Sequence, residues 1–387
     1  MTVLLALHRI GPYHHARFQA AAKHLTLTVL ETRPQSQEYP WEFIPPQPAY
    51  AIAQLPVAAD PEQDLPTAEL DRQLQAFCNR LQPQAIVTVG WADRAYQRLL
   101  LLAQQRRIPA VIISDSRWRD QPRSFLPEAI KRNLLRGYSA AIVAGQESQA
   151  YLEQLGFPAT AIFQPWDVVD NAFFAQAATT HAKTSLNPHF LCISRFIAKK
   201  NHQGLLEAYA LYQGQGGQWG LKLVGSGPLE SSMRQQIQTL PQPQQVHLQP
   251  FQQLEVIAQC YAQAQAFILA SSSDQWGLVV NEAMAAGVPV LVSSACGCAI
   301  DLVKPGVSGW VFDPEQPQAL AALLHRVEQQ SPTARSDLIA AACHQLEHFS
   351  PATFALGLVR AIAHAQQFPR YSRRATALAQ LLSHRQP

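Results

Sequence analysis

Two carboxylates stand near one predicted helix start in the stretch 267–302. Asp274 follows the apolar run FILA, and Glu282 lies in the helical segment behind it, in the spacing Asp274-x7-Glu282. An apolar run, a polar loop, a helix and a second apolar run, VPVLVSS, are typical of one βαβ unit. Ligands of open α/β sheets bind beyond the carboxyl ends of the strands. Carboxylates at this edge can accept hydrogen bonds from sugar hydroxyls, and the backbone amides of Gly277 and Leu278 can bind an anion.

A basic pair occupies an earlier loop. Arg195 and Lys200 follow the apolar run FLCIS and precede the helical segment QGLLEAYALYQ. An arginine fork and a lysine point charge near a helix start can converge on one dianionic group. Basic residues are common on protein surfaces, so the pair indicates a phosphate site only in combination with the carboxylate motif later in the chain. The loop GSGP, with Gly225 and Gly227, also joins a strand to a helix and lets a nucleotide approach the backbone closely.

These motifs carry a family resemblance. Arg195-x4-Lys200, and Asp274-x7-Glu282 followed by AMAAGVPV, resemble the motifs of the family 4 (group 1) retaining glycosyltransferases of the GT-B fold. That family usually has Glu where this chain has Asp274, which is one methylene shorter. The resemblance implies that Arg195 and Lys200 neutralise a donor diphosphate as the sugar bond breaks. It also implies that Asp274 binds hydroxyls of the donor sugar and that Glu282 binds those of the ribose.

The length of the chain predicts two domains, because 387 residues exceed one ordinary hydrophobic core. We expect a first domain over 1–175, a polar linker over 175–189, and a second domain over 187–350. The resemblance implies an α/β protein of two Rossmann-like, doubly wound domains that face each other across a cleft. The first domain would bind the acceptor and the second the nucleotide-sugar, with a C-terminal helix at about 365–387 packing back on the first.

Three residues of the first domain are further candidates. Gly11 follows the first strand, where it either lets the donor approach the backbone or makes an ordinary strand-to-helix turn. If His14 faces the cleft, it contacts the acceptor or the donor, and we assign it to the acceptor side. Asp115 ends the strand AVIISDS, at a position where the family usually has His. It either orients the acceptor hydroxyl or acts on its proton, as a catalytic group, or else it caps the segment that follows.

Composition and charge exclude several classes. A net charge of +3 is too small to argue for nucleic acid, and no apolar run approaches the roughly 20 residues of a membrane span. Six scattered cysteines predict a reducing, cytoplasmic location, with Cys296 and Cys298 as small buried residues. No Asp-x-Asp motif is present, so we expect neither a required metal nor another cofactor. The segment 117–136 mixes basic and aromatic residues. This mixture is typical of peripheral contact with the anionic inner face of a membrane, of a site for a lipid-phosphate acceptor, or of a solvated helix face.

The function that these features favour is sugar transfer. We expect a hexose-type sugar to move from a UDP- or GDP-linked donor to a glycan or lipid-linked acceptor with retention of configuration, in polysaccharide or glycoconjugate biosynthesis. A catalytically reduced nucleotide-sugar-binding protein is one alternative, motivated by Asp274 and by the missing histidine. Another GT-B enzyme, such as an epimerase or a phosphorylase, is a second. The lack of a lysine motif for pyridoxal phosphate disfavours the glycogen-phosphorylase type.

Overall fold

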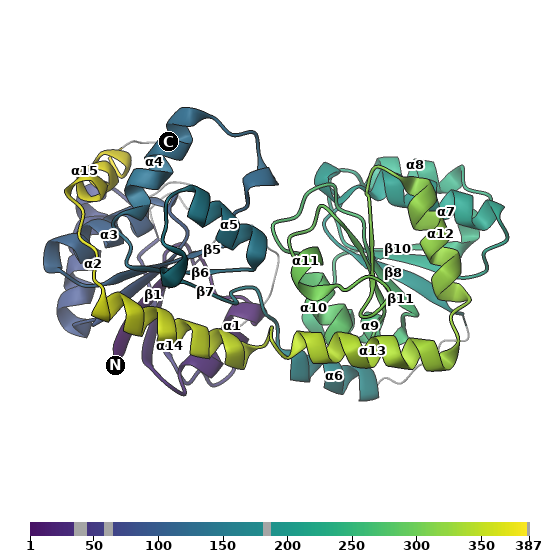
Figure 1. Cartoon of the computed structure of the whole chain (residues 1–387), viewed down its shortest axis with the longest axis horizontal. Coiled ribbons are helices and arrows are strands. Elements are labelled where there is room, and N and C mark those ends of the chain that lie inside the picture. Colours follow the sequence, from purple (N-terminus) through teal and green to yellow (C-terminus); the bar gives the residue numbers. More distant parts are fainter. Residues whose placement is uncertain (35–44, 58–64, 181–186, 385–387) are drawn as a thin grey trace. The chain divides into compact units, whose positions relative to one another are not determined.

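The computed structural model describes residues 1–34, 45–57, 65–180 and 187–384. They form two compact units, one of Met1–Val168 with Pro351–Pro387 and one of Val169–Ser350 (Figure 1). Residues 181–186 of the predicted linker and 385–387 of the predicted C-terminal helix lie outside the described residues. In the part of the chain that the structure describes, no helix is both long enough and apolar enough to cross a bilayer.

The first unit is built on a parallel sheet in the order β3-β2-β1-β4-β5-β6-β7. Its central strands are nearly continuous apolar runs because helices cover both of their faces. The strands described in this unit are β1 (Thr2–Leu7), β2 (Thr26–Glu31), β3 (Ala51–Gln54), β4 (Ala85–Val89), β5 (Ala110–Ser114), β6 (Ala140–Val143) and β7 (Ile162–Phe163).

The helices of the first unit lie on both faces of this sheet. Helices α1 (Pro12–Ala21) and α14 (Pro351–Gln367) pack against each other, and α14 also contacts β5, β6 and β7. The other face supports a second group, whose apolar side chains share one core with the sheet. That group comprises α2 (Thr67–Leu81), α3 (Arg94–Arg106), α4 (Phe125–Leu135), α5 (Gln146–Gln154) and α15 (Arg373–Leu382), and the short 3-10 turns of the unit are η1 (Trp118–Asp120) and η2 (Ala159–Ala161).

The second unit repeats the design on a parallel sheet in the order β10-β9-β8-β11-β12-β13. Its strands are β8 (His189–Ile193), β9 (Gly220–Val224), β10 (Val246–Gln249), β11 (Ala266–Leu269), β12 (Val290–Ser293) and β13 (Trp310–Phe312). Helices α7 (His202–Gly214), α8 (Glu230–Gln238) and α12 (Pro317–Glu328) share the core on one face. The remaining elements are α6 (Asn171–Thr180), α9 (Leu254–Gln263), α10 (Leu278–Ala285), α11 (Ala299–Leu302), α13 (Pro332–Leu346), η3 (Ala198–Lys200) and η4 (Pro243–Gln245).

Both sheets follow the Rossmann strand order, with a change of direction between β1 and β4 in the first unit and between β8 and β11 in the second. The predicted pair of doubly wound α/β domains is confirmed. In such sheets the loops at the carboxyl ends of the strands beside the change of direction hold the ligand. The loops after β1, β4 and β5, and those after β8, β9, β11 and β12, are therefore where chemistry is expected.

The unit boundaries differ from the predicted domain boundaries. The second unit begins at Val169 rather than at residue 187, because α6 packs against α9 and α10. Asn171 at the start of α6 donates from Nδ2 to the carbonyl of Phe349 at 3.2 Å. The chain returns to the first unit at Pro351, ahead of the predicted helix at about 365–387, because α14 packs on α1 and α15 on α3.

Candidate functional site

Backbone hydrogen bonds join four loops of the second unit at the carboxyl ends of its strands. The loop after β8 meets the loop after β9, where the Phe196 amide donates to the Ser226 carbonyl at 2.9 Å. The same loop meets the one after β11, where the Ser272 amide donates to the Lys199 carbonyl at 2.9 Å. The loop after β12 closes the set, with Asp274 and Cys296 forming an isolated bridge. These contacts fix the backbone on which the predicted site residues stand.

The turn that carries Lys200 ends in a strained residue. Asn201 adopts a left-handed φ of 51°, a conformation that asparagine tolerates better than most residues. Its Oδ1 accepts the Gly204 amide at 3.3 Å and caps α7, while its Nδ2 donates to the Pro314 carbonyl at 3.0 Å. Lys200 is thus held on a rigid turn at the start of a helix.

Lys200 and Asp274 form an ion pair between Nζ and Oδ2. Each side chain is only 12% exposed, and Ser271 Oγ lies 3.4 Å from the same carboxylate oxygen. Two sequence motifs that lie far apart in the chain therefore meet side chain to side chain. A phosphate can bind the Lys200 ammonium only by displacing the Asp274 carboxylate. Once displaced, that carboxylate can accept a hydrogen bond from a ligand hydroxyl.

Arg195 lies on the same loop as Lys200, just past the end of β8, and is exposed. Its carbonyl accepts the Ile197 amide at 3.0 Å, so its backbone is held in the turn that leads to Lys200. The two cations thus stand at one end of one strand, as the spacing Arg195-x4-Lys200 predicts. Their action on a diphosphate remains a prediction.

Gly225 and Gly227 have a structural role that the sequence reading missed. Their φ angles are 153° and 158°, and a Cβ on Gly225 would overlap the Ser194 carbonyl oxygen. A Cβ on Gly227 would lie 2.5 Å from the Phe196 carbonyl oxygen. The loop after β9 can pack against the loop of Arg195 only because both side chains are absent. Their predicted contact with the donor remains a prediction.

The start of α10 is close to the predicted one. Gly277 precedes the helix with φ of 107°, and Leu278 is its first residue. A Cβ on Gly277 would lie 2.7 Å from Leu269 Cδ2, so glycine is required both by conformation and by packing. Glu282 is buried, and its Oε2 accepts the hydroxyl of Tyr261 at 2.9 Å. The carboxylate is therefore held in place, and its predicted contact with ribose remains a prediction.

The cysteines beside this helix are buried and free of disulfides, as predicted. Cys296 and Cys298 lie in the turn between β12 and α11. The Cys298 amide donates to the Trp276 carbonyl at 3.1 Å, which ties this turn to the residue before Gly277. Their small size suits a turn that is packed against the start of α10.

Gly11 and His14 form the start of α1 in the first unit. Gly11 has an extended φ of −114°, which any residue can adopt, and a Cβ there would meet only His14 Nδ1, at 3.8 Å. His14 Nδ1 accepts the Gly11 amide at 3.2 Å, and its ring packs against Phe18 and Trp166. The ring thus closes the first turn of α1. Its contact with an acceptor remains a prediction.

The half-buried ring of His14 predicts a pH dependence of stability. Burial, followed by the charge of Arg17, lowers the pKa of His14 from 6.5 to about 3. Between these values the unfolded chain binds a proton that the folded chain does not, so the free energy of unfolding falls as the pH drops below 6.5. By pH 4.5 this costs about 2.7 kcal/mol.

A His14→Gln variant tests this dependence. Denaturant unfolding at pH 7 and pH 4.5 should show a smaller loss of unfolding free energy for the variant than for the wild type. His24→Gln, which replaces an exposed histidine of the same unit, serves as control and should keep the full loss. Equal losses in all three proteins would show that His14 titrates in the folded state.

Asp115 lies in the first unit, at the carboxyl end of β5. It borders a pocket of about 220 Å³ whose wall also includes His8, Asp93 and Trp91. Its carbonyl accepts Ser148 Oγ at 3.0 Å. Asp115 does not cap the turn that follows it, because the cap position of η1 is Arg117. Its action on an acceptor remains a prediction.

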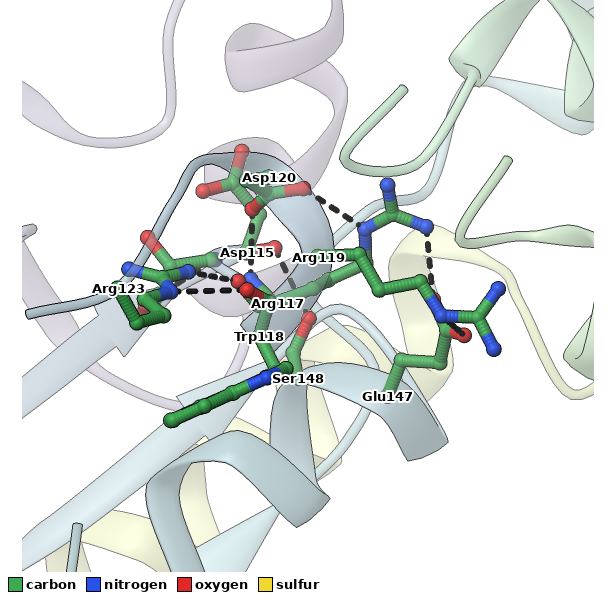
Figure 2. A network of polar contacts seen from close by, with 10 residues as sticks. Asp115, Arg117, Trp118, Arg119, Asp120, Arg123, Glu147 and Ser148 are labelled. Atoms are coloured by element: carbon green, nitrogen blue, oxygen red, sulfur yellow. Dashed lines mark hydrogen bonds and ion pairs between the residues drawn. The ribbon is translucent and has the colours of Figure 1, made fainter. Parts of the chain in front are cut away.

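The segment after Asp115 is held by a network of ion pairs that Figure 2 shows. Arg117 is buried, and it pairs with Asp120 at 2.9 Å and with Glu147 at 2.7 Å. The carbonyl of Arg117 accepts a hydrogen bond from Arg123, whose Nε also donates to the Trp118 carbonyl at 2.8 Å. These two arginines therefore shape the loop beside Asp115 and are not a solvated basic face.

The sequence reading missed His8 and Asp93, which line the same pocket as Asp115. His8 directly follows β1, and Asp93 lies in the loop between β4 and α3. Both thus stand at the carboxyl edge of the sheet, as Asp115 does. The rule that singled out Asp115, a polar residue directly after a buried strand, would have found His8 if it had been applied to β1. The signal for Asp93 is a different one, an aspartate at the cap position of α3.

Comparison with solved structures decides the fold. HepE of Anabaena, solved in complex with UDP and glucose, is similar with a TM-score of 0.72 and 18% identity over 94% of this chain and 99% of that one. The chain has the GT-B fold. Within it, residues 178–345 match the family model described as Glycosyl transferases group 1. That region contains the two loops that bring Lys200 and Asp274 together.

Two curated proteins are similar to parts of this GT-B chain. The amylovoran biosynthesis glycosyltransferase AmsK of Erwinia amylovora is 33% identical over 145 residues, which are 36% of this chain and 35% of AmsK. The putative colanic acid biosynthesis glycosyltransferase WcaL of Salmonella typhimurium is 29% identical over 140 residues, which are 35% of this chain and 34% of WcaL. The alignments thus span about a third of each of these relatives.

Proposed function

We propose that this protein is a retaining glycosyltransferase of family 4. It moves a hexose-type sugar from a UDP- or GDP-linked donor to a glycan or lipid-linked acceptor, in polysaccharide or glycoconjugate biosynthesis. The observation that carries the proposal is the ion pair of Lys200 and Asp274 at the carboxyl ends of β8 and β11, inside the region that matches the group 1 model. The names of AmsK and WcaL and the UDP bound by HepE support the donor and the pathway class.

The proposed mechanism is electrostatic. As the bond between the sugar and the diphosphate breaks, negative charge develops on the leaving phosphate. Arg195, Lys200 and the amides at the start of α10 stabilise that charge in place, at little cost of reorganisation. When Lys200 turns to the phosphate, Asp274 accepts hydrogen bonds from hydroxyls of the donor sugar, and Glu282 binds the ribose. The chain supplies these cations itself, so the proposal includes no metal.

Thermal-shift measurements test the donor site. UDP, GDP, ADP and their sugar conjugates are screened against the wild type and against Arg195→Ala. A ligand that binds only the folded protein adds about 2.7 kcal/mol of stability at 100 times its Kd. We expect one nucleotide to raise the melting temperature of the wild type and to lose most of that effect in Arg195→Ala. If no nucleotide shifts the wild type, the proposed donor site is wrong.

We also propose that the protein contacts the anionic inner face of a membrane through the residues around the start of α4. Phe125 is 86% exposed, Leu126 67% and Trp118 50%, and the exposed Arg119 and Arg132 stand near them in the sequence. Apolar side chains that enter the headgroup region beside cations are typical of peripheral binding. Because Arg117 and Arg123 are engaged in ion pairs, this contact depends on the apolar side chains more than the sequence suggested.

Vesicle binding tests this contact. Replacing both Phe125 and Leu126 with serine removes side chains whose burial is worth about 2 kcal/mol each, so binding should weaken tenfold or more. Flotation with vesicles of phosphatidylglycerol and phosphatidylcholine at low salt measures the effect. Phe368→Ser, which replaces an exposed phenylalanine elsewhere in the same unit, should bind as the wild type does. No binding by the wild type would contradict the proposal.

A further inference from the structure

The pocket beside Asp115 contains a histidine in a defined orientation. His8 stacks on Tyr96 with ring centroids 5.5 Å apart and an angle of 17° between the planes. Its Nε2 lies 3.0 Å from Asp93 Oδ2. A carboxylate accepts, so in the neutral ring Nε2 carries the proton and Nδ1 carries the lone pair. The ring is 40% exposed, so Nδ1 can accept a hydrogen bond from a ligand hydroxyl.

Asp93 is fixed from three sides. Its Oδ2 also accepts Arg33 Nε at 3.0 Å, and its Oδ1 accepts the Ala95 amide at 2.7 Å, which caps α3. The side chain is only 5% exposed. Burial alone would raise the pKa of Asp93, but the hydrogen bond and charge of His8, together with Arg33, lower it below its usual value. The carboxylate therefore stays ionised and keeps His8 in one tautomer.

The wall of the pocket selects the kind of ligand. It includes the half-buried indole of Trp91 and the carboxylates of Asp93 and Asp115, and its described lining residues include no lysine or arginine. An aromatic face beside hydrogen-bonding carboxylates suits the apolar face and the hydroxyls of a sugar ring. These carboxylates can only accept hydrogen bonds, so they suit the hydroxyls of a sugar, whereas a ligand carboxylate or phosphate has no proton to donate to them. The volume of about 220 Å³ offers room for a single monosaccharide.

We propose that this pocket binds the terminal sugar of the acceptor as a neutral pyranose, and that His8 orients one of its hydroxyls through Nδ1. Asp93 is the positioning residue, acting through His8, and Trp91 provides the stacking face. The inference rests on the proposed sugar transfer and narrows its acceptor to a neutral glycan end, in preference to a uronic acid or a lipid phosphate. The same chemistry applies whether that glycan end is free or linked to a lipid.

Saturation-transfer NMR tests the pocket without a donor. The probes are methyl glucoside, methyl galactoside, methyl mannoside and methyl glucuronide at millimolar concentration. At least one neutral pyranoside should receive saturation from the wild type, and the glucuronide should not. The signal should disappear in Trp91→Ala and persist in Trp118→Ala, which removes an exposed tryptophan of the same unit outside the pocket. No signal from any neutral pyranoside, or a preference for the glucuronide, would overturn the inference.

Kinetics of Asp93→Asn test the positioning of His8. Asparagine is also a good helix cap, so α3 should remain stable. With a pyranoside that binds as acceptor, we expect the kcat of transfer to fall by up to about 100-fold, the cost that a misplacement of about 1 Å can have. The KM for the nucleotide-sugar and its slow hydrolysis without acceptor should not change. An equal loss of hydrolysis and transfer would show a merely structural role and contradict the assignment.

The two proposals can fail separately. If no nucleotide binds the wild type, the proposed sugar transfer is wrong, while the NMR measurement still decides whether the pocket binds a pyranose. If a nucleotide-sugar binds and is hydrolysed but no neutral pyranoside reaches the pocket, only the acceptor inference is overturned.

Discussion

Lys200→Ala should lower the rate of sugar transfer by about 10²-fold or more, the usual cost of losing one preorganised group that stabilises developing charge. The ammonium group lies on a rigid turn at the start of α7 and is largely buried beside Asp274. In this setting it is desolvated, so its attraction for a phosphate is stronger than that of a surface lysine. Transfer of a radiolabelled sugar, measured at saturating donor, gives the effect on kcat directly.

The neighbouring lysine supplies the control. Lys199 is exposed, and its contact with the loop after β11 is made by its backbone carbonyl, which accepts the Ser272 amide. Lys199→Ala keeps that carbonyl and should transfer at nearly the wild-type rate. If Lys200→Ala transfers as fast as Lys199→Ala does, the proposed phosphate site is wrong.

A double variant separates catalysis from stability. Lys200→Ala leaves the carboxylate of Asp274 partly buried without its cation, which itself destabilises the fold. Adding Asp274→Asn removes that unpaired charge, so the melting temperature should recover while transfer stays low. Recovery of transfer together with stability would mean that Lys200 acts only by holding the loop.

Gly225→Ala should lower the free energy of unfolding by about 3 kcal/mol or more, because it combines backbone strain with a steric overlap. Glycine here has φ of 153°, and an added Cβ would overlap the backbone carbonyl of Ser194. This carbonyl belongs to the backbone and not to a flexible side chain, so the overlap is relieved only if the loop of Arg195 moves. Nucleotide binding should weaken in the same variant, and urea unfolding and thermal shifts measure the two effects.

Gly214→Ala is the matched control for this substitution. Gly214 is the last residue of α7, and a Cβ there meets nothing within 4 Å. Alanine is a better helix former than glycine, so the variant should be unchanged or more stable by up to about 1 kcal/mol. If Gly225→Ala unfolds as Gly214→Ala does, the packing of the two loops is not what requires glycine.

Local patterns in the sequence determined the architecture and the edges at which chemistry occurs. The apolar runs FLCIS and FILA predict buried strands, because a parallel strand covered on both faces needs nearly continuous apolar side chains. A polar loop that follows such a run must lie at the carboxyl edge of the sheet. This reasoning placed Arg195, Asp274 and Asp115 at their edges without any knowledge of the tertiary structure.

Only the tertiary structure decided which side chains meet. The pairing of Lys200 with Asp274, and that of His8 with Asp93, joins residues far apart in the chain, and strand order sets such distances whereas local periodicity does not. The same reason explains the burial of Arg117. From the sequence alone it is expected to be an exposed charge, but the fold brings Glu147 beside it and the two form an ion pair. Spacing along a chain predicts the end of an element, but contacts between elements depend on how the whole core packs.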